Sequence, residues 1–104
     1  MNYEKELDRI VKEEPARVYH EFLRVIKGLF EDFVSGKVDA LTVSNITVYW
    51  YVGKEEFSEG LILINPKVKE LSLAMDITHP DYSKEKKIEI IKGLIKKINL
   101  MLKD

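Results

Sequence analysis

The chain has 104 residues, of which 45% are hydrophobic and 34% are charged, and its formal net charge is -1. This balance is typical of a single globular domain over 1–104 and excludes a disordered chain. The sequence contains no cysteine, which excludes disulfide scaffolds, thiol nucleophiles, iron–sulfur clusters and thiolate zinc sites.

The sequence and its composition also predict the cellular location and the source of the protein. No apolar run approaches the roughly 20 residues that a membrane-spanning helix needs, and residues 1–14 carry charges throughout, unlike a signal peptide. We therefore predict a cytoplasmic protein with no membrane partner. Lysine supplies 14 of the 17 basic side chains and glutamine is absent, a bias that is typical of hyperthermophiles and predicts a thermophilic source.

The first third of the chain shows a helical pattern. Apolar residues recur at spacings of three and four over residues 7–33. Pro15 interrupts this stripe, and proline fits the first turn of a helix better than its interior. We therefore predict helices over 3–13 and 15–35, with one helix kinked at Pro15 as the alternative. Gly36 suits the left-handed position that ends a helix.

The middle third is rich in β-branched and aromatic residues, which favour strands. Residues 41–52 alternate between apolar and polar side chains, and we predict a strand there. The alternation slips by one residue around Ser44 and Asn45, which requires a bulge or a later start to the strand. A second strand is predicted over 57–65, after a hairpin loop. A third, over about 70–78, alternates cleanly.

The last third repeats apolar residues at helical spacing over 84–103, after Ser83 as a suitable N-cap. The predicted order is two helices, three strands and one helix. Short connections make the sheet an antiparallel meander with the helices packed on it, which is an α+β fold. In this arrangement Val48, Trp50 and Val52 face the helices.

The outer face of this predicted sheet indicates a function. Tyr49, Tyr51 and Ala74 lie on it together with leucine and isoleucine side chains of the second strand. Monomers seldom expose so much apolar surface. A helix could wrap over this face, two copies could pair sheet to sheet, or another partner or ligand could dock there. We predict a non-catalytic interaction or adaptor module that forms a homodimer, or binds another protein, through these three residues.

The charge distribution predicts an alternative function. Residues 83–104 carry seven basic and three acidic side chains, so this segment is +4 and the rest of the chain is -5. The alternative is nucleic-acid binding, in which the last helix contacts phosphates. The candidate contacts are Lys86, Lys92, Lys96 and Lys97. Lysines also suit the C-terminal half of any helix, so this function is our second choice.

The sequence contains no motif for catalysis. It has no glycine-rich phosphate loop, no HExxH and no GxSxG. Asp76, His79 and Asp81 occur together in the run DITHPD and could form a small metal or acid–base cluster. A strand end followed by a turn explains them better, because Pro80 restricts His79 to extended geometry. We therefore predict no enzymatic activity, no cofactor and no metal.

Overall fold

Residues 2–103 fold mainly into helices. In this computed structural model, which describes residues 2–103, five α-helices and one 3₁₀-helix follow one another. They are α1 (Tyr3–Ile10), α2 (Pro15–Val34), α3 (Ala40–Tyr51), α4 (Glu55–Ile64), η1 (Pro66–Thr78) and α5 (Lys84–Leu102). Residues 2–103 contain no strand, so the predicted α+β fold with its three-stranded sheet is wrong. None of the helices in this range has the length and apolar character needed to cross a membrane.

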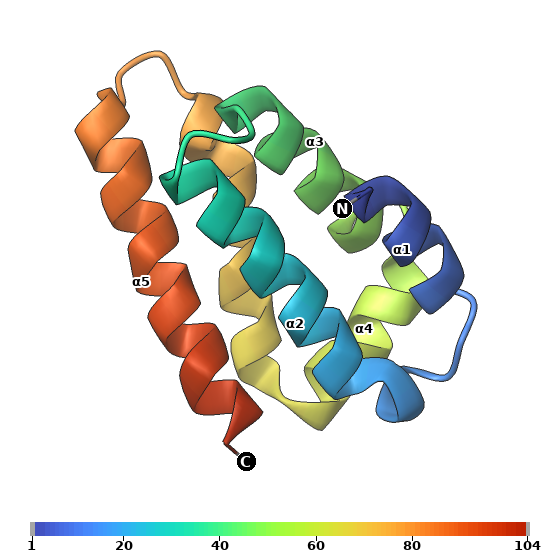
Figure 1. The fold of residues 1–104 in the computed structure, drawn as a ribbon. Helices are drawn as coiled ribbons and strands as arrows, with labels where there is room; N and C mark the ends of the chain where they lie inside the picture. The colour runs from blue at the N-terminus through green and yellow to red at the C-terminus, as the bar shows by residue number, and fades with distance from the viewer. Residues whose placement is uncertain (1, 104) are drawn as a thin grey trace.

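The other helices are arranged around α2 (Figure 1). α2 packs against α1, α3, α4 and α5. η1 lies behind α2 in this view and contacts α3, α4 and α5. The inward side chains form one core, in which the rings of Phe22 and Trp50 meet edge to face with centroids 4.8 Å apart. The segment for which the sequence predicts a sheet therefore forms helices instead. These helices share one core with the N-terminal helices.

The helices predicted in the first and last thirds are confirmed. Pro15 is the first residue of α2 and separates it from α1, so the chain forms two helices and not one kinked helix. Gly36 follows α2 with a φ of 83°, the left-handed conformation that suits glycine. Ser83 caps α5 by accepting a hydrogen bond of 3.1 Å from the backbone N–H of Lys86.

The first predicted strand is α3 instead. Its most buried apolar and hydroxyl side chains recur at helical spacing and include Val43, Ile46, Thr47 and Trp50. This spacing explains the slip around Ser44 and Asn45, because a period of 3.6 drifts out of step with a period of two. Asp39 caps α3, and hydrogen bonds from Thr42 hold the pKa of its carboxyl below the usual value. Packing on the core therefore outweighs the β propensity of these residues.

The second predicted strand is α4, and the third is the 3₁₀-helix η1. A 3₁₀-helix has three residues per turn, so one row of η1 points inward at every third position. This row is fully buried and consists of Val68, Leu71, Ala74 and Ile77. Runs as long as the 13 residues of η1 are uncommon. In an α-helix, these four residues would be spread over about half of the circumference and would not share one side. Packing between α3 and α5 therefore selects the tighter helix.

Two tyrosine hydroxyls hold α1 in place. Tyr3 of α1 donates to Asp32 of α2, and Tyr49 of α3 donates to Asp8 of α1. Burial and the Asp32 carboxylate raise the pKa of Tyr3. The hydrogen bond to Asp8 raises the pKa of Tyr49 to about 12. These two contacts fasten α1 to both α2 and α3.

Candidate interaction surface

The three residues predicted to bind a partner do not share one open face. Tyr49 is half-buried and its hydroxyl donates to Asp8. Tyr51 is half-buried and packs edge to face on Trp50, with ring centroids 5.5 Å apart. Ala74 is fully buried, because it belongs to the inward row of η1. The sheet face on which this interface depends does not exist, so pairing sheet to sheet is wrong.

The exposed lysines of α5 stand among carboxylates. Lys92 and Lys96 line a shallow hollow together with Glu85 and Glu89. Lys86 is exposed in the first turn of the same helix. Because acidic side chains share the face with Lys92 and Lys96, a phosphate backbone would meet both signs of charge there.

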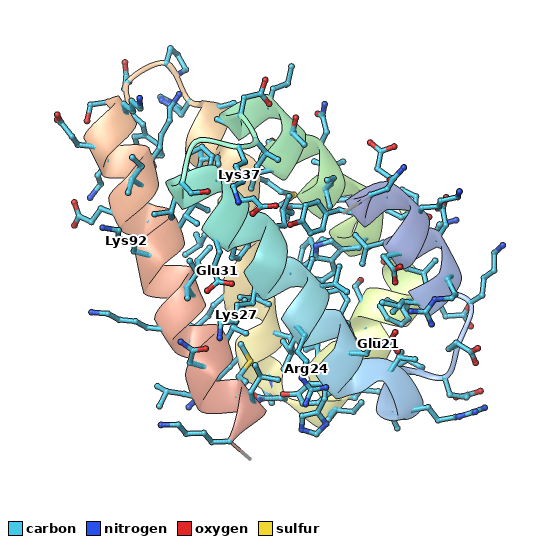
Figure 2. The ribbon with its side chains drawn as sticks, in the orientation of Figure 1. Glu21, Arg24, Lys27, Glu31, Lys37 and Lys92 are labelled. Carbon is cyan, nitrogen blue, oxygen red and sulfur yellow. The ribbon has the colours of Figure 1, made fainter. Side chains whose placement is uncertain are left out.

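The fourth predicted phosphate contact, Lys97, is half-buried and pairs with Glu70 of η1. The neighbouring surface of α2 does not extend a basic patch either. Figure 2 shows its outward side chains, which carry both signs of charge and include Glu21, Arg24, Lys27 and Glu31. The structure therefore brings the predicted lysines onto one helix without making a continuous basic surface.

Asp76, His79 and Asp81 do not converge on a ligand. The backbone N–H of Asp81 donates to His79 Nδ1 at 3.1 Å, so this ring nitrogen is an acceptor within the turn. The Asp81 carboxylate lies 3.7 Å from the same nitrogen, and both side chains are exposed. Over residues 2–103, no three His, Cys, Asp or Glu side chains are grouped so that they could hold a metal ion. These residues form the end of η1 and the turn that precedes α5.

Sequence reasoning missed the outer side of α3. This helix has no charged side chain over its 12 residues. Leu41, Val48 and Val52, the last at its C-cap, are 59%, 43% and 57% exposed. With Asn45 they form one row, here called the α3 stripe, because residues spaced by three and four share one side of a helix. The spacing of these four residues is the signal that could have revealed it.

η1 continues this surface beside α3. The hydroxyl of Ser44 in α3 donates to the backbone carbonyl of Met75 in η1 at 2.9 Å. Leu73 of η1 is 49% exposed. Lys69 and Asp76 are also exposed, one on either side of Leu73 along the helix. η1 therefore adds an exposed leucine between two unlike charges.

A hollow of about 410 Å³ lies where α3, α4 and η1 meet. Val52 connects this hollow to the α3 stripe, and Tyr51 and Ile62 supply further apolar lining. Its charged lining consists of Glu55, Glu59 and Lys69. The stripe therefore ends in a concave site with apolar walls and a charged edge.

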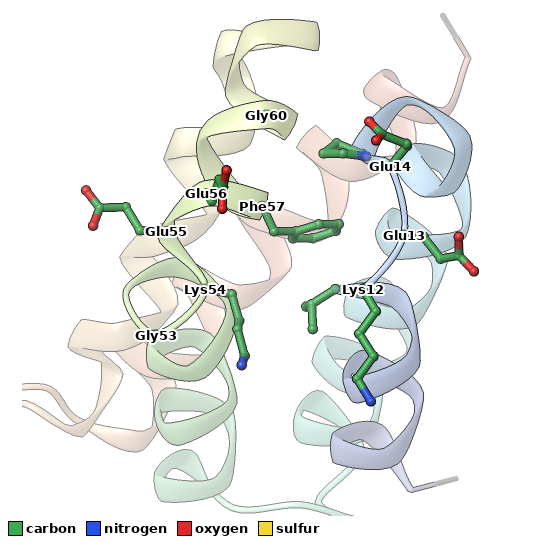
Figure 3. Close-up of a pocket in the computed structure, with 11 residues that line it drawn as sticks. Lys12, Glu13, Glu14, Gly53, Lys54, Glu55, Glu56, Phe57 and Gly60 are labelled. Atoms are coloured by element: carbon green, nitrogen blue, oxygen red, sulfur yellow. The ribbon is translucent and has the colours of Figure 1, made fainter.

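Another hollow, of about 620 Å³, separates the α1–α2 turn from the α3–α4 turn. In Figure 3, Lys12 and Lys54 lie on one side of the Phe57 ring, and Glu14 and Glu56 lie on the other. Opposite charges on opposite sides present no single sign to a ligand. A carboxylate such as Glu56 also suits the first turn of a helix, which accounts for it without a ligand. This hollow therefore indicates less about function than the α3 stripe does.

No family model matches this chain, and no curated protein or solved structure is detectably similar to it. Among residues 2–103, α3 with its C-cap carries more exposed large aliphatic side chains than any other helix, and they lie in one row, whereas Leu63 and Ile64 lie on α4 and Leu100 lies on α5.

Proposed function

We propose that this protein is a small self-associating interaction module that docks through the α3 stripe and the exposed side of η1. One observation carries the proposal: α3 is uncharged on every side, yet only part of it packs on the core. Large aliphatic side chains that lie together on an exposed side of a helix mark an interaction site. Covering the exposed aliphatic side chains gains roughly 25 cal/mol per Å² of apolar surface. A partner that covers the stripe therefore removes this apolar surface from water, which stabilises the complex.

A second copy of the chain fits a surface of this size. α3 is about 18 Å long, and packed helices lie about 8–10 Å apart, so the surface measures roughly 20 Å by 20 Å. In projection this is about half of the ~800 Å² that each partner buries in a standard interface. We therefore expect a reversible dimer of micromolar affinity and not a permanent one.

The test is the molar mass in solution over a range of concentrations, measured by light scattering and sedimentation equilibrium. The native chain should change from its monomer mass of 12.1 kDa towards twice that value as concentration rises. Leu41→Lys should weaken self-association about tenfold or more, because it places an unpaired ammonium in the interface. Leu100→Lys is the matched control, since Leu100 is 58% exposed but lies on α5.

Two results would overturn the proposal. One is a native chain that stays monomeric at every concentration, and the other is an equal loss of association in the two lysine variants. Nucleic-acid binding through α5 stays the alternative prediction, supported by the +4 charge of residues 83–104. Sedimentation with generic duplex DNA at about 50 mM salt separates the two functions, because phosphate contacts are strongest at low salt.

A further inference from the structure

Two contacts between α3 and η1 fix which residue of η1 lies beside the midpoint of the α3 stripe. Ser44 of α3 bonds to Met75 of η1, while Val52 and Lys69 line one hollow further along, so the two helices run antiparallel. The midpoint of the α3 stripe lies about 4 Å along the axis from Ser44. About 4 Å along a 3₁₀-helix is two residues, which leads from Met75 to Leu73. The midpoint of the stripe is therefore level with Leu73.

We propose that two copies pair face to face about a two-fold axis that crosses the α3 stripe at its midpoint and η1 at Leu73. This pairing rests on the proposed function and specifies its geometry. Each α3 lies antiparallel to the partner's α3, and each η1 lies antiparallel to the partner's η1. Because a two-fold interface is self-complementary, the opposing residues follow by counting outward from the two midpoints.

The apolar contacts follow from the spacing along α3. Leu41 and Val52 lie on opposite sides of the stripe midpoint at equal distances of about 8 Å. Leu41 therefore faces the partner's Val52, at the mouth of the partner's hollow of about 410 Å³. The Leu41 side chain, 59% exposed in one copy, enters this hollow beside the partner's Tyr51 and the partner's Ile62. The pairing thus fills the hollow at each end of the stripe.

The charged contacts follow from the spacing along η1. Lys69 lies about 8 Å before Leu73 on the neighbouring row of η1, and Asp76 lies about 6 Å after Leu73 on the same row. The axis therefore brings Lys69 level with the partner's Asp76 to within about 2 Å along the helix, twice in each dimer. Within residues 2–103, neither Lys69 nor Asp76 forms an ion pair, whereas the adjacent Glu70 is already paired with Lys97. A parallel pairing of η1 with the partner's η1 would instead set like charges level with each other.

Charge reversal tests this pairing at about 50 mM salt, where exposed charges are weakly screened. Lys69→Glu and Asp76→Lys should each weaken self-association about tenfold, because each change sets two pairs of like charges level with each other across the interface. An equimolar mixture of the two variants should recover the native affinity as a heterodimer, since both of its cross-pairs are unlike. Lys92→Glu on α5 is the matched control and should associate as the native chain does.

Recovery in the mixture, with circular dichroism unchanged in every variant, is the expected result. A native dimer that Leu41→Lys weakens but that neither charge reversal affects would leave the docking surface in place and show that this pairing is wrong. Loss in each variant without recovery in the mixture would also overturn the pairing. A native chain that never associates would overturn the pairing and the proposed function together.

Discussion

α3 and α5 are both side-chain-capped helices packed on the same core, yet their open sides differ. α5 buries an aliphatic row that includes Ile91, Leu94 and Ile98, and it presents lysines and glutamates to solvent. α3 has no charged side chain and presents Leu41 and Val48. Charged residues on the open side of α5 mark its period, so its sequence predicts a helix. Because α3 lacks charged residues, its helical period cannot be recognised in the sequence. For the same reason its open side is an apolar surface that a partner can cover.

The largest expected effect contrasts the two sides of α3. Trp50→Ala should lower the free energy of unfolding by about 3–5 kcal/mol, because Trp50 is fully buried against Phe22. Val48→Ala, on the open side of the same helix, should change it by less than about 0.5 kcal/mol. Urea denaturation at a protein concentration where the chain is monomeric measures both values. Similar losses in the two variants would contradict this orientation of α3.

The next effect separates the 3₁₀-helix from the strand predicted over 70–78. Leu71 is fully buried and Leu73 is 49% exposed, whereas a strand would place both on one face. Leu71→Ala should therefore lower the free energy of unfolding by about 2–5 kcal/mol. Leu73→Ala should change it by less than about 0.5 kcal/mol under the same conditions. Equal losses from the two leucines would favour period two over period three.

The smallest effect concerns single polar contacts between helices. The Tyr49 hydroxyl joins α3 to α1, whereas the Lys97 ammonium joins α5 to η1. Hydrogen bonding to Asp8 raises the pKa of Tyr49 to about 12, so the folded chain holds this proton more tightly than the unfolded chain does. The resulting stabilisation is complete below about pH 10 and is lost as the pH rises from about 10 towards 12.

Tyr49→Phe should therefore reduce the decline in stability between about pH 10 and 12. Urea denaturation at several pH values from 8 upwards, with native and variant chains in parallel, measures this change. The pKa of Tyr3 is raised in the same direction by burial and by Asp32, so part of the decline should remain in the variant. A decline as steep in Tyr49→Phe as in the native chain would show that the contact with Asp8 contributes nothing.

The candidate surface was only partly predictable from the sequence. The sequence led to an interaction module through an apolar sheet face that carries Tyr49, Tyr51 and Ala74, and residues 2–103 contain no such face. The α3 stripe, which we propose in its place, consists of other residues. Strand alternation, however, placed Val48 and Val52 on the buried side with Trp50. In the helix, Trp50 points into the core, while Val48 and Val52 are exposed. The side chains differ because residues two apart lie on one side of a strand but about 200° apart around a helix.

The sequence by itself determined the local features that depend on near neighbours. Pro15 at the start of α2, Gly36 after its end and Ser83 before α5 act through the backbone of adjacent residues, so their roles could be predicted.

Only the tertiary structure decided the conformation of residues 40–78. Their composition favours strands, and no charged row marks a helical side in α3. Packing on η1, together with Trp50 against Phe22 of α2, makes α3 a helix, and packing between α3 and α5 holds η1 at three residues per turn. Contacts between residues far apart in the chain stabilise these elements more than local propensity opposes them, and that balance cannot be read from one segment alone.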